Sequence, residues 1–509
     1  MAKMTNPINR LQRQGPGRIQ RSGTKGGGRA GGRLRGRRRK PTSPWLNRLP
    51  ATLPVSTGED NQTGRGSAGA QAPLFEEGWK AGYEKGRQAG YDDFEQIFEG
   101  TSIIIPTYNQ KEMLLQCLDR IEAYTPQPYE VIVVDDASSD GTAEALRQYR
   151  KVRVAVHDSN KGFAGSINTG LMLAKGRTVL LLNNDVFVAE RWLANMLDCL
   201  ESSPDIGAVG PVTNYIGGEQ QIDVPYQDLR DLDRFAEERS RPDRSKWRET
   251  ERLVGFCLLM RREIAHQTGY LDEGYRLGNF EDDDWIIRLR LQGLKLVIAG
   301  DAFVHHFGSV TMRSLDTNKY LEANERNRQL FSRKWGSIHE FLARDPSRRL
   351  QAGLQGCSSY EGFPAKVVVE SGTGRLYWLQ DGMKFRISAG GAYDQLAYAG
   401  PKVRVSQRDL RHLPYAGEWT LEQVKAALAE LSAPAESGPF PYKEGAVIEL
   451  PEGQWFQIDR GTARPILTRY TLEIWGLEPR ISSGSADQLA VYPEGRPVLP
   501  PVILLANEL

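Results

Sequence analysis

The chain has 509 residues, and its 66 lysines and arginines nearly balance 64 aspartates and glutamates. This balance hides an asymmetry, because residues 1–40 hold 13 of the basic residues and no acid. No stretch approaches the roughly 20 apolar residues of a membrane span, and the four cysteines show no Cys-x-x-Cys spacing, which argues against a membrane-spanning protein, a disulfide scaffold and a zinc site. We therefore expect a cytoplasmic protein, with a peripheral position at a membrane or spore surface as the alternative.

The first hundred residues are predicted to lie outside the main folded domain. Residues 1–73 are basic and rich in glycine, so they bury too little apolar surface to offset chain entropy and are expected to be disordered. Such a tail either contacts a polyanion, such as nucleic acid, teichoic acid or anionic lipid, or stays solvated without a fixed partner. Residues 74–99 are predicted to form a helix, because glycines recur every fourth residue from Gly78 to Gly90 and form one stripe. That helix docks on the core or a partner, or it is a solvated linker.

From residue 100 to about residue 345, strands and helices alternate along the chain. Alternation of this kind predicts an α/β domain whose parallel-dominated sheet carries helices on both faces. The dinucleotide fingerprint Gly-x-Gly-x-x-Gly does not follow the first strand, which ends instead in Pro106-Thr-Tyr-Asn109. The expected strands are 101–106, 131–134, 152–157 and 178–182, and the expected helices are 111–124, 142–149 and 165–175.

Acidic side chains occur at three strand or loop ends of this domain. Asp135 and Asp136 end the second strand, Asp185 follows the fourth, and residues 281–284 form the run Glu-Asp-Asp-Asp. Ligands of open α/β sheets bind at the carboxyl ends of the strands, so we expect these clusters to meet in one cleft. The cleft would suit a divalent cation and a phosphorylated substrate.

Seven motifs occur in order in this region, at residues 102–109, 133–142, 160–170, 181–185, 255–262, 279–285 and 304–308. Together they resemble the family 2 glycosyltransferases, which have the GT-A fold, and especially their bacterial rhamnosyltransferase-like subgroup. The resemblance implies an inverting, metal-dependent hexosyltransferase of cell-envelope polysaccharide biosynthesis. It would use a uridine or thymidine diphosphate sugar, with dTDP-rhamnose as one candidate, and a surface glycan or glycoconjugate acceptor.

The donor nucleotide is expected at the ends of the first two strands. A carboxylate of Asp135 or Asp136 can accept the imide N–H of a pyrimidine, and Tyr108 can cover the ring. Asp140, in contrast, is expected to serve as a turn and helix cap. The full set of predicted donor-binding residues is Pro106, Thr107, Tyr108, Asn109, Asp135, Asp136, Asn160, Lys161, Gly162 and Asn184.

The metal, Mn²⁺ or Mg²⁺, is expected at Asp185. The family's Asp-x-Asp motif appears here as Asn183-Asn184-Asp185, so one carboxylate is replaced by an amide that offers a carbonyl oxygen but no charge. By resemblance, a histidine of the pair His305 and His306 completes the protein's contribution, with His305 preferred.

The run at residues 281–284 is predicted to handle the acceptor proton. Asp282 matches the family's catalytic aspartate and would act as general base, and crowded carboxylates raise the proton affinity of one of them. Glu281, Asp284 and Trp285 are placed on the acceptor side, although Asp284 also suits a helix start. Two connecting segments flank this site: 214–221 would border the donor sugar, and the charged segment 231–251 would be a mobile loop over the acceptor.

The last third of the chain contains a repeat. Residues 365–420 and 444–500 match at an offset of 79 residues, which predicts two copies of one small β-rich unit. Residues 374–387 read as a hairpin with its turn at Asp381-Gly382, similar to the hairpin repeats of bacterial cell-surface proteins. These units bind a polysaccharide, envelope or partner protein, or they pack on the catalytic domain or form a dimer contact.

A different class of protein fits the same sequence. Asn183 stands in place of an acid, which leaves open a non-enzymatic surface- or spore-associated binding protein. In that case the transferase domain is degenerate, and the basic tail and the repeats are the working parts. The intact Asp185 and Asp282 favour the enzyme instead.

Overall fold

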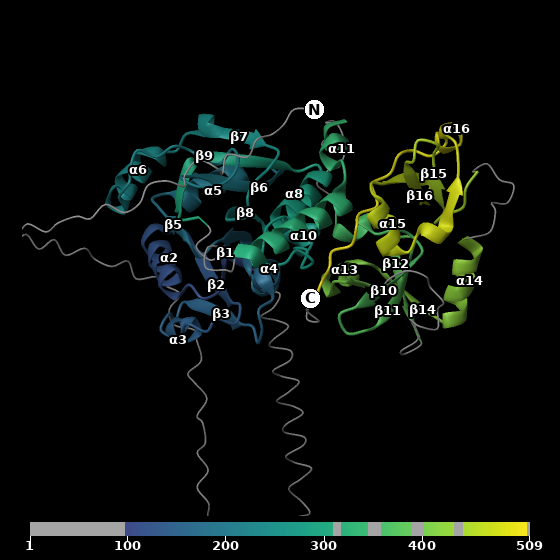
Figure 1. Ribbon diagram of the computed structural model, residues 1–509, viewed down its shortest axis with the longest axis horizontal. Helices are drawn as coiled ribbons and strands as arrows, with labels where there is room; N and C mark the ends of the chain where they lie inside the picture. The colour runs from purple at the N-terminus through teal and green to yellow at the C-terminus, as the bar shows by residue number, and fades with distance from the viewer. Residues whose placement is uncertain (1–96, 309–316, 345–357, 389–401, 432–440, 506–509) are drawn as a thin grey trace, which may run out of the picture. The chain divides into compact units, whose positions relative to one another are not determined.

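The computed structural model describes residues 97–308, 317–344, 358–388, 402–431 and 441–505 (Figure 1). The basic tail and almost all of the glycine-repeat helix predicted at 74–99 lie outside the described residues. The end of that predicted helix is wrong, because Phe98 and Glu99 belong to the first strand. Among the described residues, no helix is both long and apolar enough to cross a membrane.

Residues 98–306 contain one nine-stranded sheet in the order β3-β2-β1-β4-β8-β6-β9-β5, with β7 paired to β9. The expected α/β class is confirmed, but the sheet is mixed rather than dominated by parallel pairs. Strands β3, β2, β1 and β4 are parallel, whereas β8 runs antiparallel to both β4 and β6. The strands are β1 Phe98–Thr107, β2 Tyr129–Asp135, β3 Val152–Val156, β4 Gly176–Leu182, β5 Val186–Val188, β6 Ile206–Thr213, β7 Trp247–Thr250, β8 Cys257–Arg261 and β9 Lys295–His306.

Helices cover both faces of this sheet, because its strands are apolar on both sides. Ile104 of β1 packs in one cluster with helices α4, α7 and α8, whereas its neighbours Ile103 and Ile105 pack in another with α2 and α5. This alternation follows from the two-residue period of a strand. The helices of this region are α2 Lys111–Tyr124, α3 Thr142–Leu146, α4 Gly162–Leu173, α5 Trp192–Glu201, α6 Leu232–Arg239, α7 Arg262–Thr268, α8 Glu281–Leu291, α10 Thr317–Trp335 and α11 Ile338–Arg344.

The segment 231–251 is ordered secondary structure, which corrects its prediction as a mobile loop. It contains α6 and then β7, which pairs antiparallel with β9 from Trp247 to Thr250. Leu232 and Ala236 of α6 are buried in the core. Two apolar positions four residues apart were the local signal for this amphipathic helix, and they were outweighed by the many charges of the surrounding segment.

The two predicted units form two further sheets, of five and four strands, in which the order β13-β10-β11-β12 corresponds to β18-β15-β16-β17. The central hairpins, β11–β12 and β16–β17, are offset by 79 residues. The predicted turn at Asp381-Gly382 is confirmed: both residues have positive φ, 54° and 70°, as a two-residue type I′ hairpin requires. The elements are β10 Val367–Ser371, β11 Leu376–Gln380, β12 Met383–Ile387, β13 Val403–Val405, α13 Gln407–His412, β14 Tyr415–Trp419, α14 Leu421–Leu431, β15 Val447–Glu449, β16 Trp455–Asp459, β17 Thr462–Ile466, α15 Arg469–Trp475, β18 Ile481–Ser483 and α16 Ala486–Leu489.

Candidate active site

A cleft of about 250 Å³ lies where β1, β2 and β4 end and α4 and α8 begin. It brings together the three acidic regions that lie far apart in the sequence, as expected for the carboxyl edge of such a sheet. Its lining includes the predicted residues Pro106, Thr107, Tyr108, Asp136, Asn160, Gly162, Asn184, Asp185, Glu281, Asp282 and His306. The predicted residues Asn109, Asp135, Lys161, Asp284, Trp285 and His305 are absent from this lining.

Asp185 and His306 face each other in the cleft. The Nε2 atom of His306 lies 3.3 Å from Oδ1 of Asp185, and both atoms are buried without a hydrogen-bond partner. The Nδ1 atom of His306 lies 2.8 Å from the carbonyl oxygen of Tyr215. Since a carbonyl only accepts, Nδ1 carries a proton, and Nε2 is the ring atom that faces Asp185. A carboxylate oxygen and an imidazole nitrogen held this close can share one cation, either a proton or a metal ion.

His305 does not point into the cleft, which reverses the order of preference between the two histidines. Its Nδ1 lies 2.8 Å from the hydroxyl of Tyr226, and its ring packs against Phe307. Burial and the neighbouring His306 lower the pKa of His305 to about 4, so the ring is neutral at physiological pH. We assign it a packing role beside α6 and β5.

Asp282 stands in the first turn of α8 at the cleft. Its Oδ2 accepts from the backbone N–H of Gly255 at 2.9 Å, and its Oδ1 accepts from the N–H of Asp283 at 2.9 Å. Burial and the charge of Asp283 raise the pKa of Asp282 to about 6. Burial and Asp282 raise the pKa of Glu281 well above its usual value, and Glu281 Oε2 is buried without a partner. The pair therefore combines a carboxylate near its proton-transfer range with a carboxyl group that tends to stay protonated.

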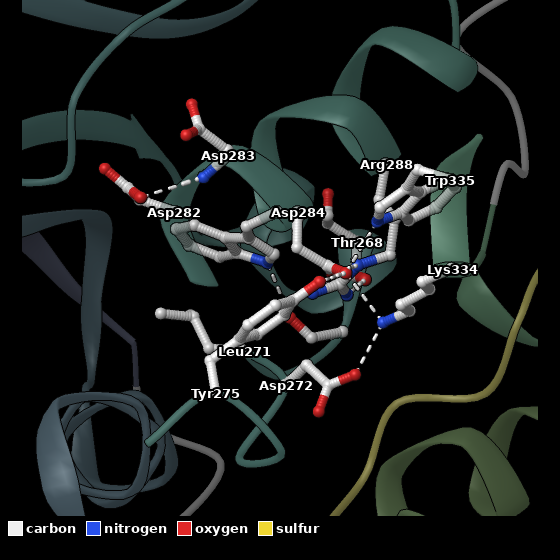
Figure 2. A network of polar contacts seen from close by, with 12 residues as sticks. Thr268, Leu271, Asp272, Tyr275, Asp282, Asp283, Asp284, Arg288, Lys334 and Trp335 are labelled. Atoms are coloured by element: carbon white, nitrogen blue, oxygen red, sulfur yellow. Dashed lines mark hydrogen bonds and ion pairs between the residues drawn. The ribbon is translucent and has the colours of Figure 1, made fainter. Parts of the chain in front are cut away.

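Asp284 and Trp285, which were predicted on the acceptor side, belong to the protein interior and do not line the cleft. Both side chains are fully buried. Asp284 Oδ2 lies 2.6 Å from Nζ of Lys334 and accepts from the indole of Trp335, while Oδ1 pairs with Arg288. Figure 2 shows this network, with the side chains of Asp282 and Asp283 pointing away from it. On a helix, residues 282 and 284 lie about 200° apart, so they face different surroundings.

The two aspartates at the end of β2 differ in what their oxygens contact. Both carboxylate oxygens of Asp136 contact other residues of the chain. Oδ1 accepts from the N–H of Lys161 at 2.7 Å and Oδ2 accepts from the N–H of Gly162 at 2.9 Å. His157 Nδ1 lies 2.8 Å from Oδ1. Asp136 thus holds the loop that starts α4. Asp135 Oδ1 accepts from Ser138, while its buried Oδ2 has no partner.

Several of the predicted donor-side residues shape the cleft through their own contacts. Asn184 donates to the hydroxyl of Thr107 at 2.9 Å, which joins the ends of β4 and β1. Asn109 accepts from the N–H of Ser139, and its own N–H donates to Ser138. Asp140 satisfies the N–H groups of Thr142 and Lys111, at the starts of α3 and α2; the helix cap itself is Gly141.

Sequence reasoning missed the residues that orient His306. Asn214 accepts from its backbone N–H at 2.8 Å and donates to its carbonyl at 3.1 Å. Phe256 stacks on its ring, with centroids 5.0 Å apart. A signal existed for Asn214, because it opens the segment 214–221 that was expected to border the donor. Phe256 lies in the motif at residues 255–262, but the motif did not predict its contact with His306.

Comparison with known families matches part of the region that forms this cleft. Residues 102–269 match the family described as Glycosyl transferase family 2, whereas the cleft residues from Leu277 to Asp282 and His306 lie beyond the matched range.

The chain is similar to several named glycosyltransferases. Glycosyltransferase AglE of Haloferax volcanii is 26% identical over 230 residues, which cover 43% of this chain and 71% of AglE. Glycosyltransferase GlyG of Streptococcus pneumoniae serotype 4 is 26% identical over 209 residues, 39% of this chain and 68% of GlyG. The crystal structure of GalNAc-T7 with UDP, GalNAc and Mn²⁺ aligns at a TM-score of 0.36 and 18% identity, covering 51% of this chain and 55% of that chain.

Proposed function

We propose that the protein is an inverting, metal-dependent GT-A glycosyltransferase that moves a sugar from a uridine or thymidine diphosphate donor to a surface glycan or glycoconjugate. The observation that carries this proposal is the cleft in which Asp185 and His306 converge on one side and Asp282 stands on another. A rhamnose donor is the finer expectation that follows from the sequence resemblance.

The residues at the end of β4 fit a divalent cation. Asp185 Oδ1 and His306 Nε2 are buried, unpartnered and 3.3 Å apart, and carboxylate with imidazole suits Mn²⁺ better than Ca²⁺. Among the described residues, no group of three or more His, Cys, Asp or Glu side chains forms a metal site. The diphosphate and water would therefore supply the remaining ligands. A bound cation would neutralise the charge of the departing diphosphate as a Lewis acid.

Asp282 supplies the base. The acceptor oxygen forms a bond to the anomeric carbon while the bond from that carbon to the diphosphate oxygen breaks, and the diphosphate leaves with the electron pair. The acceptor proton passes to the carboxylate of Asp282, whose two oxygens are already oriented by backbone N–H groups. One displacement inverts the anomeric centre. Glu281 lies beside it with a pKa that burial and Asp282 raise well above its usual value, and its unpartnered Oε2 is suited to hydrogen-bond a sugar or acceptor hydroxyl.

The test is binding followed by transfer. Calorimetry with Mn²⁺ should show uridine or thymidine diphosphate binding to the full-length protein, and binding should weaken in chelator. A panel of nucleotide sugars then identifies the donor by transfer or slow hydrolysis. A protein that binds no nucleoside diphosphate with either Mn²⁺ or Mg²⁺ would refute the proposal and favour a binding protein with a degenerate domain.

A further inference from the structure

The backbone just before Asp282 is strained. Four consecutive residues, Leu277, Gly278, Asn279 and Phe280, have positive φ of 62°, 104°, 76° and 76°. L-residues other than glycine rarely adopt this left-handed region, and runs of them are disfavoured by contacts of Cβ with the backbone. Leu277, Gly278 and Asn279 line the cleft. Strain of this kind persists only where the surroundings impose it.

Asn327 of α10 provides that restraint. Its side chain is fully buried, and its Oδ1 accepts from the backbone N–H of Arg276 at 3.0 Å. Its Nδ2 contacts the carbonyl oxygens of Arg276, Gly278 and Asn279 at 2.9, 3.0 and 3.2 Å. One carboxamide thus pairs with one donor and three acceptors of residues 276–279. Its removal would leave these four backbone contacts unmade, and an unmade hydrogen bond is costly where the group is buried, as at Gly278.

The contacts of Asn327 belong to one stripe of α10. The amide of Asn279 donates to the hydroxyl of Tyr320 at 3.1 Å and to Oδ1 of Asn324 at 3.3 Å. Phe331 packs on Phe280, with ring centroids 5.5 Å apart. Positions 320, 324, 327, 331 and 334 recur every three or four residues and so share one helix face. Lys334, at the end of the stripe, reaches Asp284 (Figure 2).

The segment that this stripe contacts leads directly into α8. Phe280 is the N-cap of α8, and its carbonyl accepts from the N–H of Asp284 at 2.9 Å. Glu281 and Asp282 follow directly, so a change in the dihedral angles of residues 277–280 would reorient both carboxyl groups. The segment also forms part of the cleft wall on their side.

We propose that Asn327 is a positioning residue for sugar transfer: its amide holds residues 277–280 in the left-handed conformation and thereby fixes Asp282 relative to the acceptor. This inference rests on the proposed function. Asparagine is required because leucine has neither donor nor acceptor, and aspartate would place a carboxylate against three carbonyl oxygens.

The experiment compares Asn327→Leu with Gln329→Leu, an exposed glutamine two residues along the same helix, in the full-length protein. We measure amide hydrogen exchange of residues 276–284, the affinity for uridine diphosphate with Mn²⁺, and kcat at saturating donor. In Asn327→Leu we expect faster exchange in this segment, almost unchanged nucleotide affinity and a kcat lower by roughly tenfold to a hundredfold, the scale of a misplaced reacting group. Gln329→Leu should match the wild type.

The double variant Tyr320→Phe/Asn324→Ala provides a milder test if Asn327→Leu does not fold. It removes only the two hydrogen bonds to Asn279 and should lower kcat less, again without weakening nucleotide binding. Wild-type kcat in a folded Asn327→Leu protein, or a loss that follows nucleotide affinity, would overturn the inference. A wild-type protein without nucleotide binding or transfer would refute the proposed function instead, and the exchange data would still show whether Asn327 holds the segment.

Discussion

The ammonium of Lys334 lies 2.6 Å from Oδ2 of Asp284 and 2.5 Å from Oδ2 of Asp272, with all three side chains fully buried. Burial alone would raise the pKa of Asp284, but Lys334 and Arg288 hold it below its usual value. Lys334 thus contacts two carboxylates inside the domain, and Arg288 pairs with one of them, Asp284. The network lies behind the cleft, where it fixes α8 and α10 to each other.

Lys334→Met should therefore destabilise the fold, because it leaves Asp272 and Asp284 in the interior without that cation. Removing one partner of a buried ion pair costs about 3–5 kcal/mol, measurable by denaturant unfolding. The double variant Lys334→Met/Asp272→Asn should recover part of that loss, since it removes one uncompensated charge. Equal stability of wild type and Lys334→Met would show that the buried charges are not coupled.

The pH dependence of transfer should report Asp282, whose pKa is raised to about 6. A base must be deprotonated, so kcat should rise with pH through about 6 and then level off. Asp282→Asn should lower kcat by roughly 10²-fold or more, with nucleotide affinity preserved. Loss of nucleotide binding in this variant would move the catalytic role to a neighbour.

The free energy of unfolding should depend on the protonation of Asp282 in the opposite direction to kcat, and should fall as the pH rises. Between the unfolded pKa of about 3.9 and the folded value of about 6, the folded state binds the extra proton. Asp282 therefore adds to the free energy of unfolding at pH values below this window. That contribution is lost as the pH rises through the window. Urea unfolding at pH 4.5 and 7 should show a smaller difference in Asp282→Asn than in the wild type.

Metal dependence should follow Asp185 and His306 and not His305. Asp185→Ala and His306→Ala should lose the Mn²⁺-dependent part of nucleoside diphosphate binding, and chelated wild type should regain activity when Mn²⁺ or Mg²⁺ is added. His305→Phe keeps an aromatic ring beside Phe307 and should retain metal dependence, which makes it the matched control. Full turnover of the wild type in excess chelator would contradict this prediction.

Nucleotide selectivity should favour pyrimidines if the end of β2 holds the base. Guanosine diphosphate should bind much more weakly than uridine or thymidine diphosphate in calorimetry. Because Asp136 accepts from the N–H groups of Lys161 and Gly162, Asp136→Ala should weaken all nucleotides by releasing this loop. Asp135→Asn should act mainly on selectivity. Equal affinity for purine and pyrimidine diphosphates would place base recognition elsewhere.

The sequence was sufficient for those features that depend on short segments. Alternating strands and helices predicted the α/β class, and carboxylates at strand ends predicted that Asp136, Asp185 and Asp282 would meet. The turn at Asp381-Gly382 follows from residue chemistry alone, since few side chains tolerate positive φ. Each of these features depends on residues that are close along the chain, so sequence periodicity and motif spacing predict it.

Side-chain direction depended on the tertiary structure. Neighbouring residues of a strand point to opposite faces, so only one of His305 and His306 can face Asp185, and the pairing of β9 with β5 selects His306. The direction of the Asp284 side chain is also a tertiary effect. It points into the interior because it pairs there with Lys334, fifty residues away on another helix. No local sequence pattern predicts the hydrogen bonds between Asn327 and the backbone of residues 276–279. The chain therefore encodes which chemical groups are present through local pattern, while long-range packing decides which of them reach the cleft.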